Sequence, residues 1–489
     1  MTDINVPLVD ARHHARLTEI RRWADKIAPH WSRWRTRSRY FHKADEDYLR
    51  FLIPENLHVL ELGCGTGDTL AALKPEFGVG IDVSSEMIQV AMDAHSELYF
   101  QVLDVEDPDA FGDIQRSGSF DVVLLDSTLG FLSDIQRFLD RLISLCSPET
   151  RVIVTSHSYV WEPLFMVATR LGLRMPTPRV TWLRLSDVEN LLDLSGFETI
   201  KRESRLLSPY RLLGIGSFIN RFIATLPLIQ NACLRQYLVA RPTPTPTGVK
   251  TLSATVVIPC RNEKGNIESA IQRLPDFCQS LEIIFVEGHS QDSTWEEILR
   301  VQAVYPERNI QSLQQPGKGK GDAVRAGFDQ ATGDVLIILD ADLTVPPEDI
   351  PKFYLAIKSG SGEFINGSRM VYDMDSGAMR FLNRLANHFF AKVFSYLLNQ
   401  TYTDTLCGTK ALRRSHYQAI AANRAYFGDF DPFGDFDLIF GAAKLNLKVV
   451  EIPIRYASRA YGSTQISRFR HGALLLRMVF FAWRKLKAL

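Results

Sequence analysis

His58-Val-Leu-Glu-Leu-Gly63-Cys-Gly-Thr-Gly67 is an apolar run that ends in three alternating glycines, and residues 68–73 after it have helical character. A short apolar run bounded by glycine indicates a buried strand, so this stretch predicts strand, loop and helix in succession. Glycine at a strand end lets the backbone approach a ligand that a side chain would exclude. The stretch therefore predicts an α/β fold with a ligand-binding loop.

Acidic residues end the strands that are expected next along the chain. The strand at 78–81 ends at Asp82, about 20 residues after the loop begins, where a carboxylate can accept both hydroxyls of an adenosine ribose. The strands at 99–103 and 120–125 end at Asp104 and Asp126. Ligands of open α/β sheets bind at the carboxyl ends of strands. The pattern thus predicts a doubly wound sheet that binds an adenosyl cofactor.

Residues 50–241 resemble the class I S-adenosylmethionine-dependent methyltransferases. The likeness rests on the E-x-G-x-G-x-G loop, the acid at the second strand end, and residues 236–242, which are similar to the closing strand of that family. The loop differs from the G-x-G-x-x-G of Rossmann-type dehydrogenases, which argues against a dehydrogenase. The resemblance implies a Rossmann-like domain that binds S-adenosylmethionine. It assigns the cofactor contacts to Glu61, Gly63, Gly65, Gly67, Asp82, Asp104 and Val105.

The methyl acceptor is not evident from the sequence. Residues 126–134 and the segment from His157 to Trp161 follow the fourth and fifth strands, so they are expected on the acceptor side. His157 is either a general base for an oxygen nucleophile or a polar residue that is hydrogen-bonded at a strand end. The alternative for the whole domain is a module that binds the cofactor or a partner without turnover.

A second acidic strand end lies in the C-terminal half, where the apolar run 335–339 leads into Asp340-Ala-Asp342. Strands expected at 254–258 and 282–286 alternate with helices, which predicts a second α/β sheet. Two carboxylates at a sheet edge can hold Mg²⁺ or Mn²⁺, whose remaining ligands are usually substrate phosphates. Asp340 and Asp342 are therefore the candidate metal ligands, and the expected ligand is a nucleoside diphosphate.

Residues 250–475 resemble the inverting family 2 glycosyltransferases, and most closely the polyprenyl (dolichyl) phosphate mannosyl- and glucosyltransferases. The motifs are V-V-I-P-x-x-N-E (256–263), G-K-G-x-x-x-x-V-R (317–325), T-G-D (332–334), D-x-D (340–342), D-T-L-C-G-T (404–409) and Y-G-S-T (461–464). The resemblance implies a GT-A fold and a donor of the GDP-mannose or UDP-glucose type. It places the nucleotide sugar at Pro259, Glu263, Glu287, Asp322 and Asp340.

Two features of this half leave its chemistry open. The family usually has Asp-Asp-Gly-Ser where this chain has Glu287-Gly-His-Ser290, so the nucleoside of the donor is not determined. Residues 428–437 hold four aspartates where the family has its acceptor-side acid, and Asp435 or Asp437 is the candidate catalytic base. A lipid phosphate acceptor is already anionic and needs no strong base.

Composition and linkers divide the chain further. A basic, aromatic leader at 1–49 either covers the first domain or binds an anionic surface, and an apolar insertion at 206–234 interrupts residues 50–241. The alternating prolines at 242–250 predict an extended linker before the second domain at 251–489. The insertion is expected either to pack against the other domain or to lie on a bilayer.

The balance of 56 basic and 56 acidic residues gives no indication of nucleic acid binding. Six cysteines without a C-x-x-C pair favour a reducing, cytoplasmic setting. Residues 379–398 and 470–487 predict amphipathic, basic helices that either pack against the sheet or bind the inner face of the cell membrane peripherally. The sequence as a whole predicts a bifunctional transferase; the alternative is a glycosyltransferase with a glycan or soluble acceptor and a non-catalytic N-terminal domain.

Overall fold

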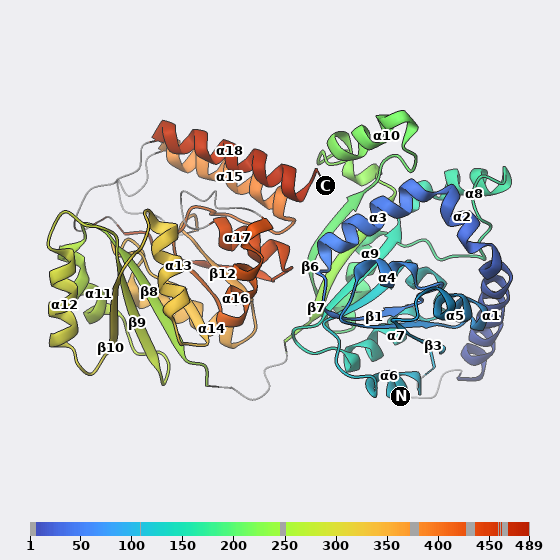
Figure 1. Cartoon of the computed structure of the whole chain (residues 1–489), viewed down its shortest axis with the longest axis horizontal. Coiled ribbons are helices and arrows are strands. Elements are labelled where there is room, and N and C mark those ends of the chain that lie inside the picture. Colours follow the sequence, from blue (N-terminus) through green and yellow to red (C-terminus); the bar gives the residue numbers. More distant parts are fainter. Residues whose placement is uncertain are drawn as a thin grey trace. The chain divides into compact units, whose positions relative to one another are not determined.

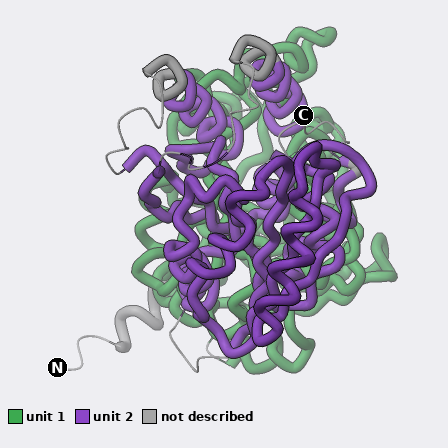
Figure 2. The backbone as a smooth tube through the Cα atoms, turned by 90° about the vertical axis from the view of Figure 1, so that its left-hand side faces the viewer, with its two compact units in different colours: residues 1–243, 488–489 green, residues 244–487 purple. Residues whose placement is uncertain are grey.

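The chain divides into two compact units, residues 1–243 with 488–489 (unit 1) and residues 244–487 (unit 2), which Figure 2 colours separately. The computed structural model describes residues 6–107, 109–244, 251–371, 381–426, 436–457, 459, 461 and 468–488. Each unit contains a seven-stranded sheet with helices packed against it (Figure 1). The predicted fold class, two doubly wound α/β sheets, is confirmed.

The sheet of unit 1 has the strand order β3-β2-β1-β4-β5-β7-β6. Strands β1 to β5 are parallel, whereas β7 lies antiparallel between β5 and β6. The order reverses between β1 and β4, and in such sheets ligands bind beyond the carboxyl ends of the strands at the reversal. The bounds are β1 His58–Leu62, β2 Phe77–Asp82, β3 Tyr99–Val102, β4 Val122–Asp126, β5 Arg151–His157, β6 Phe197–Arg205 and β7 Arg235–Pro242.

The helices of unit 1 include the basic, aromatic leader, which forms α1 to α3 and belongs to this unit. The indole of Trp23 on α1 donates to the carbonyl of Pro176 at 2.8 Å, so the leader packs on the segment that follows α8. The apolar insertion is mostly turns and short helical pieces. The bounds are α1 Val6–Ile27, α2 Trp31–Arg37, α3 Arg39–Leu52, α4 Asp68–Leu73, α5 Ser85–Ala94, α6 Ala110–Gln115, α7 Ile135–Leu142, α8 Glu162–Arg170, α9 Leu185–Leu194 and α10 Ile215–Phe218.

The sheet of unit 2 has the order β10-β9-β8-β11-β13-β12-β14. Strands β10, β9, β8 and β11 are parallel, and β13 is antiparallel to both β11 and β12. The order reverses between β8 and β11, which predicts a ligand crevice at their carboxyl ends. The bounds are β8 Ala254–Cys260, β9 Leu281–Glu287, β10 Asn309–Gln314, β11 Val335–Ile338, β12 Phe364–Ser368, β13 Lys410–Arg413 and β14 Val449–Pro453.

Helices α15 and α18 of unit 2 pack side by side (Figure 1). Each has one buried and one exposed set of apolar side chains: Met478 is buried, whereas Phe389 and Phe480 are 55% and 62% exposed. None of the described helices is both long and apolar enough to cross a membrane. The bounds are α11 Ile267–Arg273, α12 Thr294–Val304, α13 Lys320–Gln330, α14 Ile350–Lys358, α15 Phe381–Leu398, α16 Arg414–Ala422, α17 Phe436–Lys444 and α18 Arg468–Leu486.

Candidate functional sites

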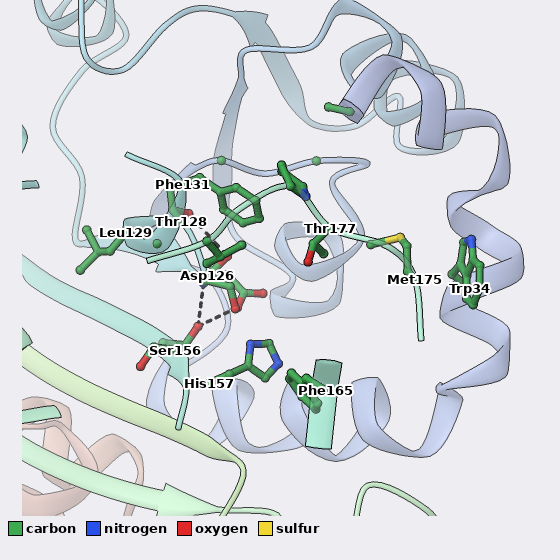
Figure 3. Close-up of a pocket in the computed structure, with 18 of the residues that line it drawn as sticks. Trp34, Asp126, Thr128, Leu129, Phe131, Ser156, His157, Phe165, Met175 and Thr177 are labelled. Carbon is green, nitrogen blue, oxygen red and sulfur yellow. Dashed lines mark hydrogen bonds between the residues drawn. The ribbon is translucent and has the colours of Figure 1, made fainter. Parts of the chain in front are cut away.

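Unit 1 contains a cavity of about 950 Å³ beyond the carboxyl ends of β1, β2, β4 and β5. Helices α1 to α3, helix α8 and residues 173–183 form its other walls, so the leader encloses the site (Figure 3). All of the predicted cofactor residues except Gly67 line this cavity. The cavity extends from the glycine loop to Trp161 and Arg174, which gives room for a cofactor and a second ligand.

The three loop glycines all have positive φ, at 79°, 54° and 73° for Gly63, Gly65 and Gly67. A Cβ at Gly63 would lie 2.7 Å from Thr128 Oγ1, and one at Gly67 would lie 2.5 Å from the ring of Phe100. A Cβ at Gly65 would meet no protein atom within 4 Å. Gly63 and Gly67 are therefore required by packing, whereas Gly65 keeps the cavity surface free for a ligand.

Two acids of this site differ in their surroundings. Asp82 accepts hydrogen bonds from the backbone N–H groups of Gly65 and Ser84, each at 2.9 Å, so it fixes the loop. Glu61 is 1% exposed, and its Oε2 has no hydrogen-bond partner among the described residues. Burial, with a contribution from Asp126, raises the pKa of Glu61 well above its ordinary value. A buried, unpaired carboxyl oxygen in the cavity wall fits a polar ligand there.

Asp104 and Val105 lie on the wall next to α1. Asp104 Oδ2 is 3.0 Å from His13 Nε2, and its Oδ1 accepts a hydrogen bond from the N–H of Glu106 at 3.0 Å. Val105 is 9% exposed and presents an apolar surface. This wall combines an apolar surface with a carboxylate, which suits a flat, polar-edged ring.

The sequence did not predict the buried cluster around Arg235. Arg235 is 2% exposed at the start of β7 and donates to Asp45, to Thr155 Oγ1 at 2.7 Å and to Asp126. Burial alone would raise the pKa of Asp126, but the adjacent Arg235 outweighs it and holds that pKa below its ordinary value. Asp126 is therefore ionised at the cavity wall, where Figure 3 labels it, and the Arg235 guanidinium fixes it there.

Two neutral imidazoles also line the cavity. His157 stacks on Phe41 with ring centroids 5.9 Å apart and meets the edge of Phe165 at 5.4 Å (Figure 3). Burial, followed by Arg235 and Arg174, lowers the pKa of His157 well below its ordinary value. Burial and Arg35 lower the pKa of His42 to about 4. Both rings are uncharged near pH 7, and both are weak proton acceptors.

In unit 2 the predicted nucleotide-sugar residues gather at the ends of β8, β9 and β11. Glu287 is 2% exposed and accepts from the N–H of Ser290 at 2.5 Å, and Asp322 accepts from the N–H of Gly317 at 2.7 Å. Glu263 accepts from Asn266 Nδ2 at 2.6 Å. Pro259 is the penultimate residue of β8. These acids shape turns at the strand ends, and their assignment to a nucleotide sugar stays a prediction.

Each carboxylate of the D-x-D motif is paired with a cation. Asp340 Oδ1 lies 2.7 Å from Lys320 Nζ, and Asp342 Oδ2 lies 2.5 Å from Nη2 of Arg459. The other terminal nitrogen of Arg459, Nη1, lies 3.6 Å from Glu263 Oε1. Burial raises the pKa of Asp340, but the adjacent Lys320 outweighs burial and holds this pKa below its ordinary value. Lys320 lies within the motif at 317–325, but neither pairing is evident from the sequence.

Within the described ranges no group of three or more His, Cys, Asp or Glu side chains forms a metal site. The two aspartates are hard oxygen donors on one strand end, and this donor type suits Mg²⁺ or Mn²⁺ that completes its shell with phosphates and water. A Cβ at Gly408 would lie 2.0 Å from Asp340 Oδ2, so the D-T-L-C-G-T motif packs directly on the D-x-D carboxylate.

The two candidate bases have different outcomes. Asp435 lies outside the described residues. Asp437, in α17, is 9% exposed and lies 3.7 Å from both Arg325 and Arg424. It lines a small depression with α16. Asp437 stays a hypothesis for the base.

Comparison with known proteins identifies both halves. Residues 53–177 match the family model described as a methyltransferase domain, and residues 255–421 match that of glycosyl transferase family 2. A methyltransferase of known structure from Thermotoga maritima is 16% identical with a TM-score of 0.35, over 45% of this chain and 99% of its own. The two family matches confirm the resemblances predicted from the sequence.

Two curated relatives match the C-terminal half. A dolichol-phosphate mannosyltransferase from Pyrococcus furiosus is 33% identical over 44% of this chain and 59% of its own length. An undecaprenyl-phosphate 4-deoxy-4-formamido-L-arabinose transferase from Pseudomonas paraeruginosa is 32% identical over 46% of this chain and 62% of its own. The chain thus spans less than two thirds of either relative.

Proposed function

We propose, because the chain joins a methyltransferase domain to a family 2 glycosyltransferase domain, that it is a bifunctional transferase. Unit 2 transfers a hexose, with inversion, from a nucleoside diphosphate sugar of the GDP-mannose or UDP-glucose type to a polyprenyl phosphate or related acceptor. Unit 1 transfers a methyl group from S-adenosylmethionine. The observation that carries the sugar transfer is the clustering of Glu263, Glu287, Asp340 and Asp342 at adjacent strand ends.

In unit 2 the chain's own residues bind and orient the donor. Asp340 and Asp342 would hold Mg²⁺ or Mn²⁺, which when bound supplies positive charge against the departing nucleoside diphosphate. Lys320 is within 2.7 Å of Asp340 and is placed to share its charge with a diphosphate. Glu263 and Glu287 are the nucleoside acceptors, and Asp322 fixes the loop that covers the donor by bonding Gly317.

The acceptor decides whether a base is required. A hydroxyl acceptor must lose a proton, and Asp435 or Asp437 is the candidate to receive it. A polyprenyl phosphate oxygen is already anionic and attacks without a base. The names of both curated relatives contain a polyprenyl-type phosphate, which favours the second case. Asp437, close to two guanidinium groups, would then have an orienting role.

In unit 1 the residues fit S-adenosylmethionine, which supplies an electrophilic methyl group when bound. Asp82 and Glu61 would bind its polar edges, while Gly65 leaves space for it and Val105 offers an apolar surface. The support from this structure is the unpaired oxygen of Glu61 together with the open space at Gly65.

The exposed apolar and basic surfaces of α15 and α18 in unit 2 support a peripheral position of the protein on the inner face of the cell membrane.

The test is sugar transfer by the full chain with a panel of UDP- and GDP-hexoses, Mn²⁺ or Mg²⁺, and a short polyprenyl phosphate. We expect lipid-dependent turnover that is lost in Asp340→Ala and Asp342→Ala and retained in Asp276→Ala, whose side chain is 75% exposed. Metal-dependent nucleotide binding without lipid turnover would support the second candidate, a glycan or soluble acceptor. Absence of any nucleotide binding would refute the glycosyltransferase proposal.

A second candidate concerns unit 1, which could bind S-adenosylmethionine or a partner without turnover. It is favoured by the weak basicity of the two imidazoles in the cavity, because a hydroxyl acceptor would find no strong base there. Equilibrium binding of S-adenosylhomocysteine, abolished by Asp82→Asn, with no methylation of any extract fraction would favour the binding module. Methylation of one fraction would exclude it.

A further inference from the structure

Nearly half of the exposed large apolar side chains in the described part of the chain lie in two short segments of unit 1. These segments, residues 163–173 and 210–228, are called the rim. Leu213 is 106% exposed, Leu228 89%, Leu171 67% and Ile215 62%. Monomeric soluble proteins seldom expose this much contiguous apolar surface, and such patches mark interaction sites.

Both segments of the rim reach the cavity, and a hydrogen bond joins residues that flank them. The indole of Trp161, just before α8, donates to the carbonyl of Ala232, just after the second segment, at 2.9 Å. Leu164, Met166 and Tyr210 line the cavity and are 57%, 52% and 51% exposed. The rim therefore meets the cavity wall at these residues, and α8 and α10, which Figure 1 labels, both belong to unit 1.

The charge of the rim is of one sign. Residues 163–173 and 210–228 contain Arg170, Arg211 and Arg221 and no aspartate or glutamate. Apolar side chains among cations suit the interface of a bilayer with anionic lipids, where the apolar groups enter the acyl region and the cations meet phosphates. The interior of another folded domain would leave those guanidinium groups without partners.

The tip of the rim is also strained. Leu212 and Leu213 have φ of 45° and 58°, which costs of order 1 kcal/mol or more for a residue with a Cβ. This conformation holds Leu213 wholly outside the unit instead of folding it inward. Backbone strain and exposure of an apolar side chain to water both cost free energy, and the cost is offset only if Leu213 is buried in another apolar environment.

Inside the cavity an arginine is left without a carboxylate. The Arg174 guanidinium lies over the ring of Phe165, 4.3 Å from its centroid, and donates to Thr177 Oγ1 at 3.3 Å. No carboxylate pairs with it among the described residues. Phe165 in turn contacts His157, so the cation stands beside the neutral imidazole and among aromatic rings. An unpaired guanidinium in an apolar wall is a ready site for an anion.

We propose that the rim docks on an anionic membrane and that the methyl acceptor of unit 1 is an anionic amphiphile, whose head group binds Arg174 while its apolar part lies among the aromatic rings. This rests on the proposed methyltransferase function of unit 1. An acceptor oxygen that is already ionised attacks the methyl carbon, the carbon–sulfur bond breaks with its electron pair going to sulfur, and no proton has to be removed. The weak basicity of His42 and His157 is consistent with such an acceptor.

The docking surface is tested with the full chain and vesicles of phosphatidylglycerol and phosphatidylcholine. Hydrogen exchange should slow in residues 163–173 and 210–228 when vesicles are added, and Leu213→Asp with Leu228→Asp should weaken vesicle binding at least tenfold. Leu194→Asp, at a leucine of α9 that is 61% exposed, is the matched control and should bind as the wild type does. Equal binding by the rim variant, or slow exchange in the rim before vesicles are added, would overturn the proposal.

The acceptor is tested by calorimetry with dodecyl phosphate as monomer, and with dodecanol and inorganic phosphate as partial ligands. Dodecyl phosphate should bind at least tenfold more tightly than either, and Arg174→Gln should weaken it at least tenfold. Arg202→Gln, at an exposed arginine paired with Glu189, should leave it unchanged. Binding of dodecanol as tightly as dodecyl phosphate would overturn the anionic head group. Binding of S-adenosylhomocysteine to the wild-type chain is measured in parallel. If S-adenosylhomocysteine does not bind, the methyltransferase proposal is refuted. If it binds and dodecyl phosphate does not, only the present inference is refuted.

Discussion

The two candidate ligand sites of this chain occupy the same position in the fold, but their carboxylates have different partners. In unit 1, Asp82 at the end of β2 is held by backbone N–H groups, and Glu61 keeps an unpaired oxygen. In unit 2, Asp340 and Asp342 are each paired with a basic side chain. Asp82 and Glu61 thus have no cationic partner among the described residues, whereas Asp340 and Asp342 each have one; Asp126 in unit 1 resembles the second pair, because Arg235 neutralises it.

The difference follows the charge of the proposed ligands. S-adenosylmethionine carries a cationic sulfonium, so Asp82 and Glu61 would need no counter-cation from the protein. A nucleoside diphosphate is anionic and arrives with a metal, so Lys320 and Arg459 can exchange a carboxylate partner for phosphate oxygens. The same position in an α/β sheet therefore suits a cationic ligand in unit 1 and an anionic ligand in unit 2.

The largest expected effect is on sugar transfer. Asp340→Asn should lower the rate of hexose transfer by about 1000-fold, or about 4 kcal/mol, because the metal and the diphosphate lose a charged ligand. Binding of S-adenosylhomocysteine should be unchanged, since the two sites are separate. Steady-state kinetics with saturating Mn²⁺ measures the first, and calorimetry the second. A parallel loss of both would contradict the comparison.

The next effect is on the stability of unit 1. Arg235→Met leaves Asp45 and Asp126 buried without their counter-charge, so the free energy of unfolding should fall by about 3 to 5 kcal/mol. Arg202→Met, at an exposed arginine, should change it by less than about 0.5 kcal/mol. Urea unfolding of the full chain, monitored on unit 1, provides the measurement. Equal stability of the two variants would show that the cluster is not structural.

Substitution at the glycine loop should cost less. Gly67→Ala should destabilise unit 1 by about 2 to 3 kcal/mol, because φ is positive and the new methyl would meet Phe100 at 2.5 Å. Gly118→Ala has a positive φ of 116° but open space around it, so about 1 kcal/mol is expected. The gap between the two denaturant midpoints isolates the contribution of packing.

Acid should destabilise unit 1 through His42. Its pKa is lowered from 6.5 to about 4 in the folded chain, so the unfolded chain takes up the proton first. The free energy of unfolding should therefore fall as the pH drops below 6.5, and the contribution of His42 to this fall should end near pH 4. Between pH 7 and pH 5 the expected loss is about 1 to 2 kcal/mol. His42→Asn should flatten that part of the profile. An unchanged profile would mean that folding does not lower the pKa of His42.

The smallest effect concerns the cation beside the metal site. Arg459→Ala removes the partner of Asp342, so the metal concentration for half-maximal sugar transfer should fall by about threefold as competition for that carboxylate ends. Arg273→Ala, which removes an exposed pair with Glu348, should leave it unchanged. An increase in the required metal would show that Arg459 supports the ligand set and does not compete with it.

Local patterns of sequence were enough to predict the strands and the residues that end them. The strand predicted before the glycine loop is β1, and Asp82 and Asp126 end β2 and β4 as expected. The glycine loop could be predicted from a local pattern, because its glycines and Glu61 are only a few residues apart in the sequence. The family resemblances extended these patterns to both halves.

Contacts between distant segments could not be predicted in the same way. Asp45 and Arg235 are 190 residues apart, and Asp342 and Arg459 are 117 apart, so neither pairing leaves a local pattern. The lowered pKa of His157 depends on Arg174 and Arg235, which reach it only in the folded unit. The leader was expected to cover the first domain or bind a surface, but its part in the cavity wall depends on how α1 to α3 pack.

The central claim is that one chain carries two independent transferase sites. Calorimetric titration of the full chain with S-adenosylhomocysteine, and with UDP or GDP in the presence of Mn²⁺, tests it most directly. We predict two sites of one-to-one stoichiometry, with Asp82→Asn weakening only the first and Asp340→Asn only the second. Failure of either ligand to bind, or loss of both sites in one well-folded variant, would contradict the account.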